Sequence, residues 1–186
     1  GFHPLKNSTN NALAGLFHID HIVGNQPTGE MKKVCKFYEK IFNWHRFWTV
    51  DDKDINTKYS SLRSIVMANQ SETIKMPINE PAAGLKKSQI QEFIDYYGTP
   101  GIQHLAFSTK DIISTVKKMK ANGVDFLPTP SSYYETLLDR VGPIHEDINI
   151  LKKLGILVDS DDNGYMLQIF TKPLQDRPTL FFEVIQ

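Results

Sequence analysis

The chain has 186 residues, enough for one sizeable domain or two small modules, and its 40% hydrophobic and 23% charged residues are typical of an ordinary globular protein. Its 21 basic residues balance its 21 acidic ones, so no net charge favours binding to nucleic acid or to an anionic membrane surface. No apolar run approaches the ~20 residues that span a bilayer. The single cysteine, Cys35, excludes an internal disulfide and is compatible with a reducing cytoplasm.

The first part of the chain predicts a linker, a strand and a helix. Residues 1–15 are rich in Asn, Ser and Gly and predict a linker that enters from elsewhere, and their polar start predicts no signal peptide. Residues 17–23 alternate as a strand does, which places His21 on one face and Asp20 on the other. Residues 30–42 carry apolar side chains at helical spacing and predict a helix.

Short strands and a second helix complete the first half. Three strand-like runs, a charged turn, a loop and a short helix follow from composition and alternation. The strands are predicted at 44–50, 59–68 and 73–77, the turn at 51–56, the loop at 79–87 and the helix at 89–97. The aromatic residues Trp44 and Trp48 favour a buried core over an interface.

The same pattern recurs in the second half. A strand at 102–108 precedes a helix at 109–122, with Thr109 as its predicted N-cap and Gly123 as its predicted stop. The remaining predictions are a strand at 124–127, an inserted helical pair at 132–154, strands at 156–159, 165–170 and 179–185, and a hairpin turn at 161–164. A β-α-β-β-β unit therefore appears twice.

This repetition predicts an α+β protein in which two βαβββ modules, at about 16–80 and 101–186, pair their sheets into one open barrel. The first strand of each module carries a histidine, His21 in one and His104 in the other. The inward faces of the strands would form a cup. We expect this cup to bring both histidines close to Glu183 of the last strand.

These three residues are of the types that bind non-haem iron. Two histidines and one carboxylate hold Fe(II) on one side and leave three coordination positions open. A 2-oxo acid can fill two of them through its carboxylate and keto oxygens, and dioxygen can take the third. The positive charge left on the metal favours such an anionic chelate. Glu183 has apolar neighbours in the sequence, so burying its charge would be costly without a cation.

Other interpretations of these residues stay open. A lone histidine on an apolar strand face is more often a hydrogen-bonded core residue than a ligand, and a glutamate in a terminal strand often lies at a solvated edge. The remaining histidines are interpreted as non-ligands; they are His3, His18, His45 and His145. No close Cys/His pair has the spacing of a zinc site.

Seven specific segments follow one another from about Leu16 to Gln186. They are I-D-H-I-V-G-N-Q-P, Y-S-S-L-R-S, K-M-P-I-N-E-P, K-K-S-Q-I-Q, G-I-Q-H-L-A-F, G-Y-M-L-Q-I-F-T-K-P and Q-D-R-P-T-L-F-F-E-V-I-Q. In these segments and in their order, the chain resembles the 4-hydroxyphenylpyruvate dioxygenase family, and most closely its animal members.

The resemblance implies a vicinal-oxygen-chelate fold in which residues 16–186 form the C-terminal, catalytic domain of a two-domain protein. It implies that His21, His104 and Glu183 are ligands of Fe(II). The implied reaction converts 4-hydroxyphenylpyruvate and O2 into homogentisate and CO2 in cytoplasmic tyrosine and phenylalanine catabolism. The implied partners are this small 2-oxo acid and O2, with no nucleic acid and no membrane span, and the full-length protein is expected to be a homo-oligomer.

The resemblance also implies a substrate pocket with polar and aromatic walls. Its catalytic polar residues are Ser64, Asn79, Gln89, Gln103 and Gln168, and its aromatic walls are Phe170 and Phe181. Amide and hydroxyl groups can hold a phenol or a water molecule without adding charge. Ser64 and Asn79 could instead satisfy turns. Simple alternation points Gln103 away from His104 unless a bulge intervenes.

We interpret the chain as a fragment that lacks the family's N-terminal domain and its final helix, which covers the pocket. Such a fragment is expected to fold and bind iron but to turn over poorly, because water enters an open site. Two alternatives remain. One is a hydroxymandelate synthase-like enzyme that oxidises the benzylic carbon, and the other is a non-catalytic binding module of the same fold.

Overall fold

The computed structural model describes residues 13–48, 55–57, 60–82, 87–161 and 164–186. The strands of the first half are β1 (Leu16–Asn25), β2 (His45–Trp48), β3 (Ile55–Thr57), β4 (Ser60–Ala68) and β5 (Lys75–Pro81). Its helices are α1 (Met31–Phe42) and α2 (Gln89–Tyr97). The strands of the second half are β6 (Gly101–Thr109), β7 (Leu157–Asp161), β8 (Gly164–Phe170) and β9 (Phe181–Ile185). Its helices are α3 (Ile112–Ala121), α4 (Ser132–Glu135), α5 (Leu137–Val141) and α6 (Ile148–Leu154).

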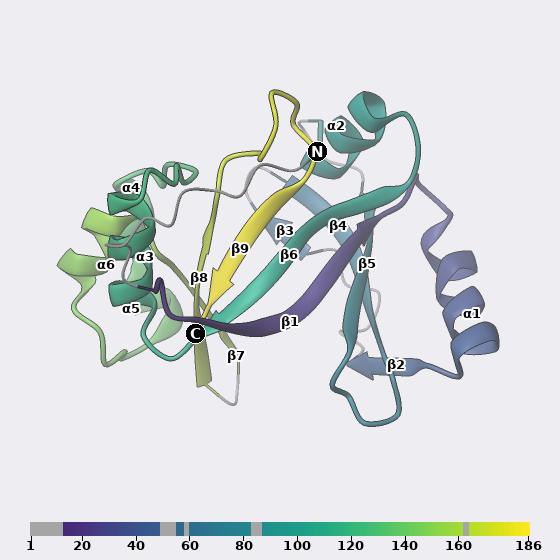
Figure 1. Ribbon diagram of the computed structural model, residues 1–186, viewed down its shortest axis with the longest axis horizontal. Coiled ribbons are helices and arrows are strands. Elements are labelled where there is room, and N and C mark those ends of the chain that lie inside the picture. The colour runs from purple at the N-terminus through teal and green to yellow at the C-terminus, as the bar shows by residue number, and fades with distance from the viewer. Residues whose placement is uncertain (1–12, 49–54, 58–59, 83–86, 162–163) are drawn as a thin grey trace, which may run out of the picture.

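The strands form one mixed sheet in the order β2-β4-β5-β1-β6-β9-β8-β7, with β3 paired to β4. β1 and β6 are antiparallel at its centre, and each has a parallel partner on its outer side, β5 for β1 and β9 for β6. The two modules therefore repeat the same order outward from the centre. The predicted α+β architecture of two βαβββ modules in one open barrel is confirmed. Figure 1 shows α1 beside the first module and α3 to α6 clustered beside the second.

The two modules bury apolar cores of different extent. In the first, the core contains Met31, Cys35, Ile65, Met67 and Ile78, from α1, β4 and β5. In the second, helices α3 to α6 pack on the sheet around a larger cluster that includes Ile112, Leu137, Leu151, Leu167 and Val184. Fully burying such a side chain contributes about 1.5–3 kcal/mol relative to leaving it exposed. These cores include Ile78 of β5 and Val184 of β9, the strands that pair with the two histidine-bearing strands β1 and β6.

A buried carboxylate ties the start of α1 to the sheet. Glu80 of β5 is 4% exposed and accepts hydrogen bonds from the backbone N–H groups of Gly29, at 2.8 Å, and Met31, at 3.1 Å. Its second oxygen lies 2.9 Å from Nη2 of Arg63. The first N–H groups of a helix lack partners within the helix, and the helix dipole favours an anion there. Glu80 therefore anchors α1 across the first module.

Strand β5 is displaced from its predicted position. The sequence predicted a strand at 73–77 and a loop at 79–87, but β5 spans Lys75–Pro81. Asn79 belongs to the strand because it pairs with Ser64 of β4. The cause is tertiary: the ladder with β4 extends past Pro77, which local sequence signals treat as a strand end.

The helix α3 begins later than predicted. Thr109 is the last residue of β6, and its hydroxyl donates to the carbonyl oxygen of Gly15 at 3.0 Å, so it is not the N-cap. Asp111 caps the helix instead, accepting from the backbone N–H of Ser114 at 2.9 Å. The predicted stop is confirmed, because Gly123 directly follows the helix with a φ of 90°.

Two further elements of the second module differ from prediction. The expected strand at 124–127 is only an isolated bridge between Phe126 and Thr171. The expected helical pair at 132–154 is three short helices, because breaks occur at Thr136 and at Gly142, which has a φ of 75°.

Some predictions concern parts of the chain that lie outside the described residues. These are most of the linker, most of the charged turn, and the middle of the hairpin turn at 161–164. The domain limits at 1–15 and 16–186 stay predictions. Within the described residues, no helix combines the length and the apolar character needed to cross a bilayer.

Candidate metal centre

Three side chains from three neighbouring strands meet at one point. His21 comes from β1, His104 from β6 and Glu183 from β9. Oε2 of Glu183 lies 3.2 Å from Nε2 of His21 and 3.1 Å from Nε2 of His104. The possible ligand atoms all lie within 4.8 Å of one another, and the described residues contain no other such group of His, Cys, Asp or Glu. The structure therefore brings these side chains together, and their role as metal ligands stays a prediction.

The register of the central strands explains this meeting. Ala106 of β6 pairs with His21 on one side and with Glu183 on the other. Directly paired residues of neighbouring strands project to the same face of a sheet, and so does His104, two residues before Ala106. Ala106 is fully buried and has only a methyl side chain. It therefore leaves room between the imidazole and the carboxylate.

Each histidine is held by the residue that precedes it. Oδ2 of Asp20 lies 3.0 Å from Nδ1 of His21, and Oε1 of Gln103 lies 3.0 Å from Nδ1 of His104. Simple alternation pointed both neighbours to the opposite face. That prediction is wrong for Asp20, whereas for Gln103 the stated exception of a bulge applies.

A β-bulge causes the departure in each strand. Asp20 is left unpaired because the residues on either side of it pair with consecutive residues of β6. Gln103 is left unpaired because the residues on either side of it pair with consecutive residues of β1. An extra residue in one strand breaks the alternation of faces and re-aims a side chain. The bulges thus bring Asp20 and Gln103 to the histidines.

The cluster is strongly coupled electrostatically. Burial by itself lowers the pKa of His21, but the carboxylates of Asp20 and Glu183 outweigh it and raise that pKa to about 9. Burial by itself raises the pKa of Glu183, but the imidazoles of His104 and His21 outweigh it and lower that pKa. The hydrogen bond from His21 likewise lowers the pKa of Asp20. Glu183, which is only 3% exposed, is therefore held as an anion.

Two aromatic rings stand beside His104. The ring of Phe181 stacks on the imidazole with centroids 4.9 Å apart and an interplanar angle of 23°. The ring of Phe170 meets the same imidazole edge-on at 6.2 Å, and the two phenyl rings lie 5.9 Å apart at 88°. They give the cluster an apolar wall.

A cavity of about 160 Å³ adjoins this wall. Its lining includes Gln89 of α2, Gln103 and Phe181, which are three of the residues predicted for the substrate pocket. The other four do not line it; they are Ser64, Asn79, Gln168 and Phe170. The predicted pocket residues are therefore divided between this cavity and other positions on the sheet.

Comparison with known proteins assigns the chain to a family. The Glyoxalase/Bleomycin resistance protein/Dioxygenase superfamily matches residues 18–175, which run from β1 to just beyond β8. The chain belongs to this superfamily. A 4-hydroxyphenylpyruvate dioxygenase from Xenopus tropicalis is 61% identical over 175 residues, which make up 92% of this chain and 44% of that relative. The chain thus spans about half the length of the curated relatives it matches.

Two solved structures have the same fold. A triple mutant of 4-hydroxymandelate synthase from Streptomyces coelicolor has a TM-score of 0.77 and 32% identity, covering 91% of this chain and 48% of that one. Methylmalonyl-CoA epimerase from Mycobacterium tuberculosis has a TM-score of 0.59 at 17% identity, covering 94% of this chain and 90% of that one. The second likeness concerns the fold alone. The predicted vicinal-oxygen-chelate fold is confirmed.

Polar residues of the first module form a row across the strands β4, β5 and β1. Ser64 pairs with Asn79, and Asn79 pairs with Asn25. The turn roles considered for Ser64 and Asn79 are wrong, since both lie in strands. Asn25 is fully buried, and within the described part of the chain neither polar atom of its side chain has a partner, nor has Oδ1 of Asn79. Buried amides are normally hydrogen-bonded, so these atoms can receive a water molecule or a ligand.

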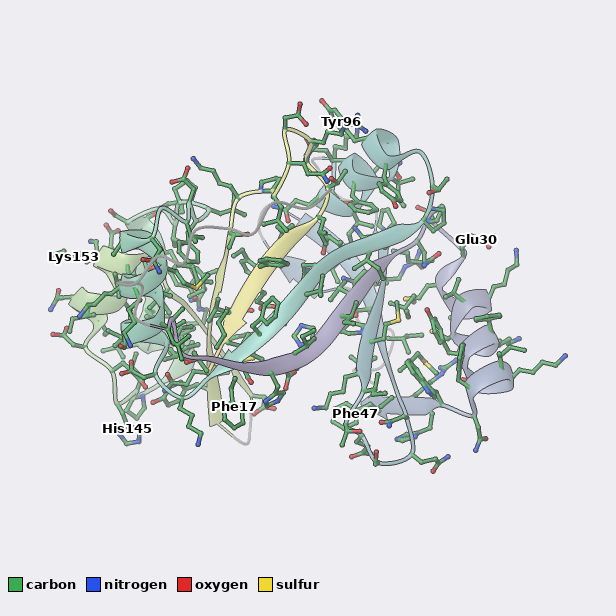
Figure 2. The ribbon with its side chains drawn as sticks, viewed as in Figure 1. Phe17, Glu30, Phe47, Tyr96, His145 and Lys153 are labelled. Atoms are coloured by element: carbon green, nitrogen blue, oxygen red, sulfur yellow. The ribbon has the colours of Figure 1, made fainter. Side chains whose placement is uncertain are left out.

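Sequence reasoning missed Asn25 and misplaced Asp20. The signal for Asn25 was a polar residue closing an apolar strand in I-V-G-N. The other described histidines lie elsewhere: His18 contacts Ser108 and His45 contacts Glu72. Figure 2 shows His145 beside the helices of the second module, away from the central strands.

Proposed function

We propose that this chain is the iron-binding, catalytic part of a 4-hydroxyphenylpyruvate dioxygenase. The observation that carries the proposal is the convergence of His21, His104 and Glu183 in a chain 61% identical to a protein of that name. The proposal makes the protein an enzyme of tyrosine and phenylalanine catabolism. With it we propose a cytoplasmic location, a 2-oxo acid and O2 as small-molecule partners, and a homo-oligomer for the full-length protein.

Two of the three separations within the donor set match those around a six-coordinate divalent ion. Adjacent ligands of such an ion, with bonds of about 2.1 Å, lie about 3 Å apart, and the two Nε2–Oε2 separations are 3.2 Å and 3.1 Å. Two imidazoles and one carboxylate are the ligands typical of Fe(II) oxygenases. A cation here also accounts for the burial of an ionised Glu183. When bound, Fe(II) supplies the reaction with O2.

The chain's own residues then bind and orient the substrate. Oε1 of Gln103 accepts from His104, so its amide N–H groups remain to donate into the cavity that Gln89 also lines. The rings of Phe170 and Phe181 exclude water and offer faces and edges for packing against a phenol ring. The substrate would thus be held by neutral amides and apolar rings while its 2-oxo acid end meets the metal.

The remaining predicted polar residues suit the far end of the substrate. Ser64 and Asn79 are paired on β4 and β5, and Gln168 lies on β8, paired with Ile185 of β9. Hydroxyl and amide groups can hold a phenol hydroxyl or an ordered water without adding a charge. We include all three in the proposed pocket.

Metal loading of single variants tests the centre directly. Anaerobically loaded wild-type chain is expected to retain Fe(II), whereas His21→Ala, His104→Ala and Glu183→Ala are each expected to lose it, because a three-ligand site cannot spare a ligand. His18→Ala changes a histidine outside the cluster and serves as the matched control. Iron retained by all three cluster variants contradicts the proposal.

Product analysis separates the alternative chemistries. The full-length protein that contains this chain, supplied with 4-hydroxyphenylpyruvate and O2, is expected to yield homogentisate and CO2. Hydroxymandelate as the product would favour the activity named for the structure that superposes with a TM-score of 0.77. Iron binding without any product would leave a non-catalytic binding module of the same fold.

A further inference from the structure

The two histidines of the candidate centre are supported alike but by groups of different charge. Nδ1 of His21 donates to the carboxylate of Asp20 and Nδ1 of His104 to the amide oxygen of Gln103, both over 3.0 Å. A carboxylate and an amide oxygen can only accept hydrogen bonds, so the hydrogen lies on Nδ1 of each ring. Nε2 of each ring is therefore the atom left for a metal ion.

The carboxylate is itself fixed from a third strand. Oδ1 of Asp20 lies 3.8 Å from Nζ of Lys75. Lys75 is the residue of β5 that pairs with His21 of β1. Asp20 therefore faces one cationic or donating group with each of its oxygens. A continuous polar chain results, from Lys75 through Asp20 and His21 to Glu183.

The difference in charge has a consequence for metal binding. A carboxylate that accepts a hydrogen bond from Nδ1–H makes Nε2 of the same ring a stronger electron-pair donor to a metal ion, and it holds the ring in place. A neutral amide makes the same contact with a weaker, uncharged hydrogen bond. The equivalent positions of the two modules therefore support their histidines unequally.

We propose that Asp20 is a positioning residue that makes His21 the stronger of the two imidazole ligands, with Gln103 supporting His104 as the weaker one. This inference rests on the proposed metal site. It predicts that one negative charge beside either imidazole, on β1 or on β6, sustains the affinity of the site, and that the position of this charge decides which imidazole is the stronger ligand.

A charge swap tests the inference, with Co(II) alone as the probe. Asp20→Asn keeps an accepting oxygen but removes the charge, and it is expected to weaken Co(II) binding by about 10- to 100-fold. Adding Gln103→Glu to that variant moves the carboxylate to the other ring and is expected to restore most of the affinity. Asp139→Asn, on the exposed side of α5, is the control. Chelator competition gives the affinities, and the Co(II) absorption bands report each change at the ligands.

The outcomes distinguish this inference from the proposed function. If the wild-type chain binds no Co(II), both are overturned. If the wild type binds it and Asp20→Asn binds it equally well with unchanged bands, the metal site stands and the inference is overturned. A loss that Gln103→Glu does not reverse also overturns the inference, because a merely structural defect at Asp20 would not respond to a charge on β6. Loss followed by recovery supports it.

Discussion

The two modules are built alike but contribute differently to the candidate centre. Each places a histidine on its first strand and supports it with the preceding residue on a bulge. In the second module, Glu183 lies two residues after the partner of His104 in the β6–β9 ladder. In the first module, His21 pairs with Lys75 in the β1–β5 ladder, and the residue two positions after Lys75 is Pro77.

Pro77 has no side-chain atom that can bind a metal, so among the proposed ligands the first module offers one and the second offers two. Among the described residues, β5 therefore adds no His, Cys, Asp or Glu to the group formed by His21, His104 and Glu183. A repeated unit can in this way hold an ion with three ligands and keep positions open for a chelating substrate. The absence of one ligand, rather than a different fold, would therefore leave coordination positions free for a substrate.

Pro77→Glu is the strongest test of this comparison. The new carboxylate, as a fourth ligand, is expected to preserve or tighten Co(II) binding. Under the proposed function it is also expected to lower turnover of 4-hydroxyphenylpyruvate by the full-length protein by at least about 100-fold, because it occupies a position that the chelate needs. Chelator competition and oxygen consumption measure the two effects. Pro77→Ala adds no donor and is the control. Turnover that is equal in both variants would refute the equivalence of Pro77 and Glu183.

The cores of the two modules give the next largest effect. Leu137→Ala, in the larger core beside the second module, is expected to lower the free energy of unfolding by about 2–5 kcal/mol through lost burial and a cavity. Leu138 is the neighbouring residue and is 47% exposed, so Leu138→Ala should change that free energy by no more than about 0.5 kcal/mol. Urea unfolding measures both. Similar values would show that the second core does not rest on the inserted helices.

The pH dependence of metal binding tests the coupling around His21. In the metal-free protein the pKa of His21 is raised from 6.5 to about 9. Below about pH 9, a metal ion must therefore displace a proton from His21. Affinity for Co(II) is expected to rise by about tenfold per pH unit as the pH approaches about 9 from below, and then to level off. The stability that the raised pKa gives the metal-free protein is complete below pH 6.5 and is lost as the pH rises through about 9. Calorimetry in two buffers detects the released proton, and an affinity independent of pH would contradict the coupling.

The smallest expected effect concerns the outer end of the polar chain in the first module. Lys75→Met removes a partly exposed ion pair worth about 0.2–1 kcal/mol, so Co(II) affinity should fall by at most about fivefold. Lys117→Met, on the exposed face of α3, controls for the change in net charge. A loss as large as that of Asp20→Asn would mean that Lys75 holds the site together more directly than its 3.8 Å separation from Asp20 indicates.

Local sequence patterns are enough to predict the repeated unit and the strands that carry His21, His104 and Glu183. Alternation, helical spacing and stop signals such as Gly123 act over a few residues, so they can be recognised without knowing the partners. The resemblance of the quoted segments added the family, and the match over residues 18–175 confirmed membership of the superfamily.

Which side chains meet at the centre depends on how distant strands pair. The bulges at Asp20 and Gln103 depend on how β1 and β6 pair, and the extent of β5 depends on its ladder with β4. A slip of one residue between strands reverses the face on which a side chain projects. Pairing between strands far apart in the sequence leaves no local periodicity, and this is why alternation alone placed both supporting residues on the wrong side.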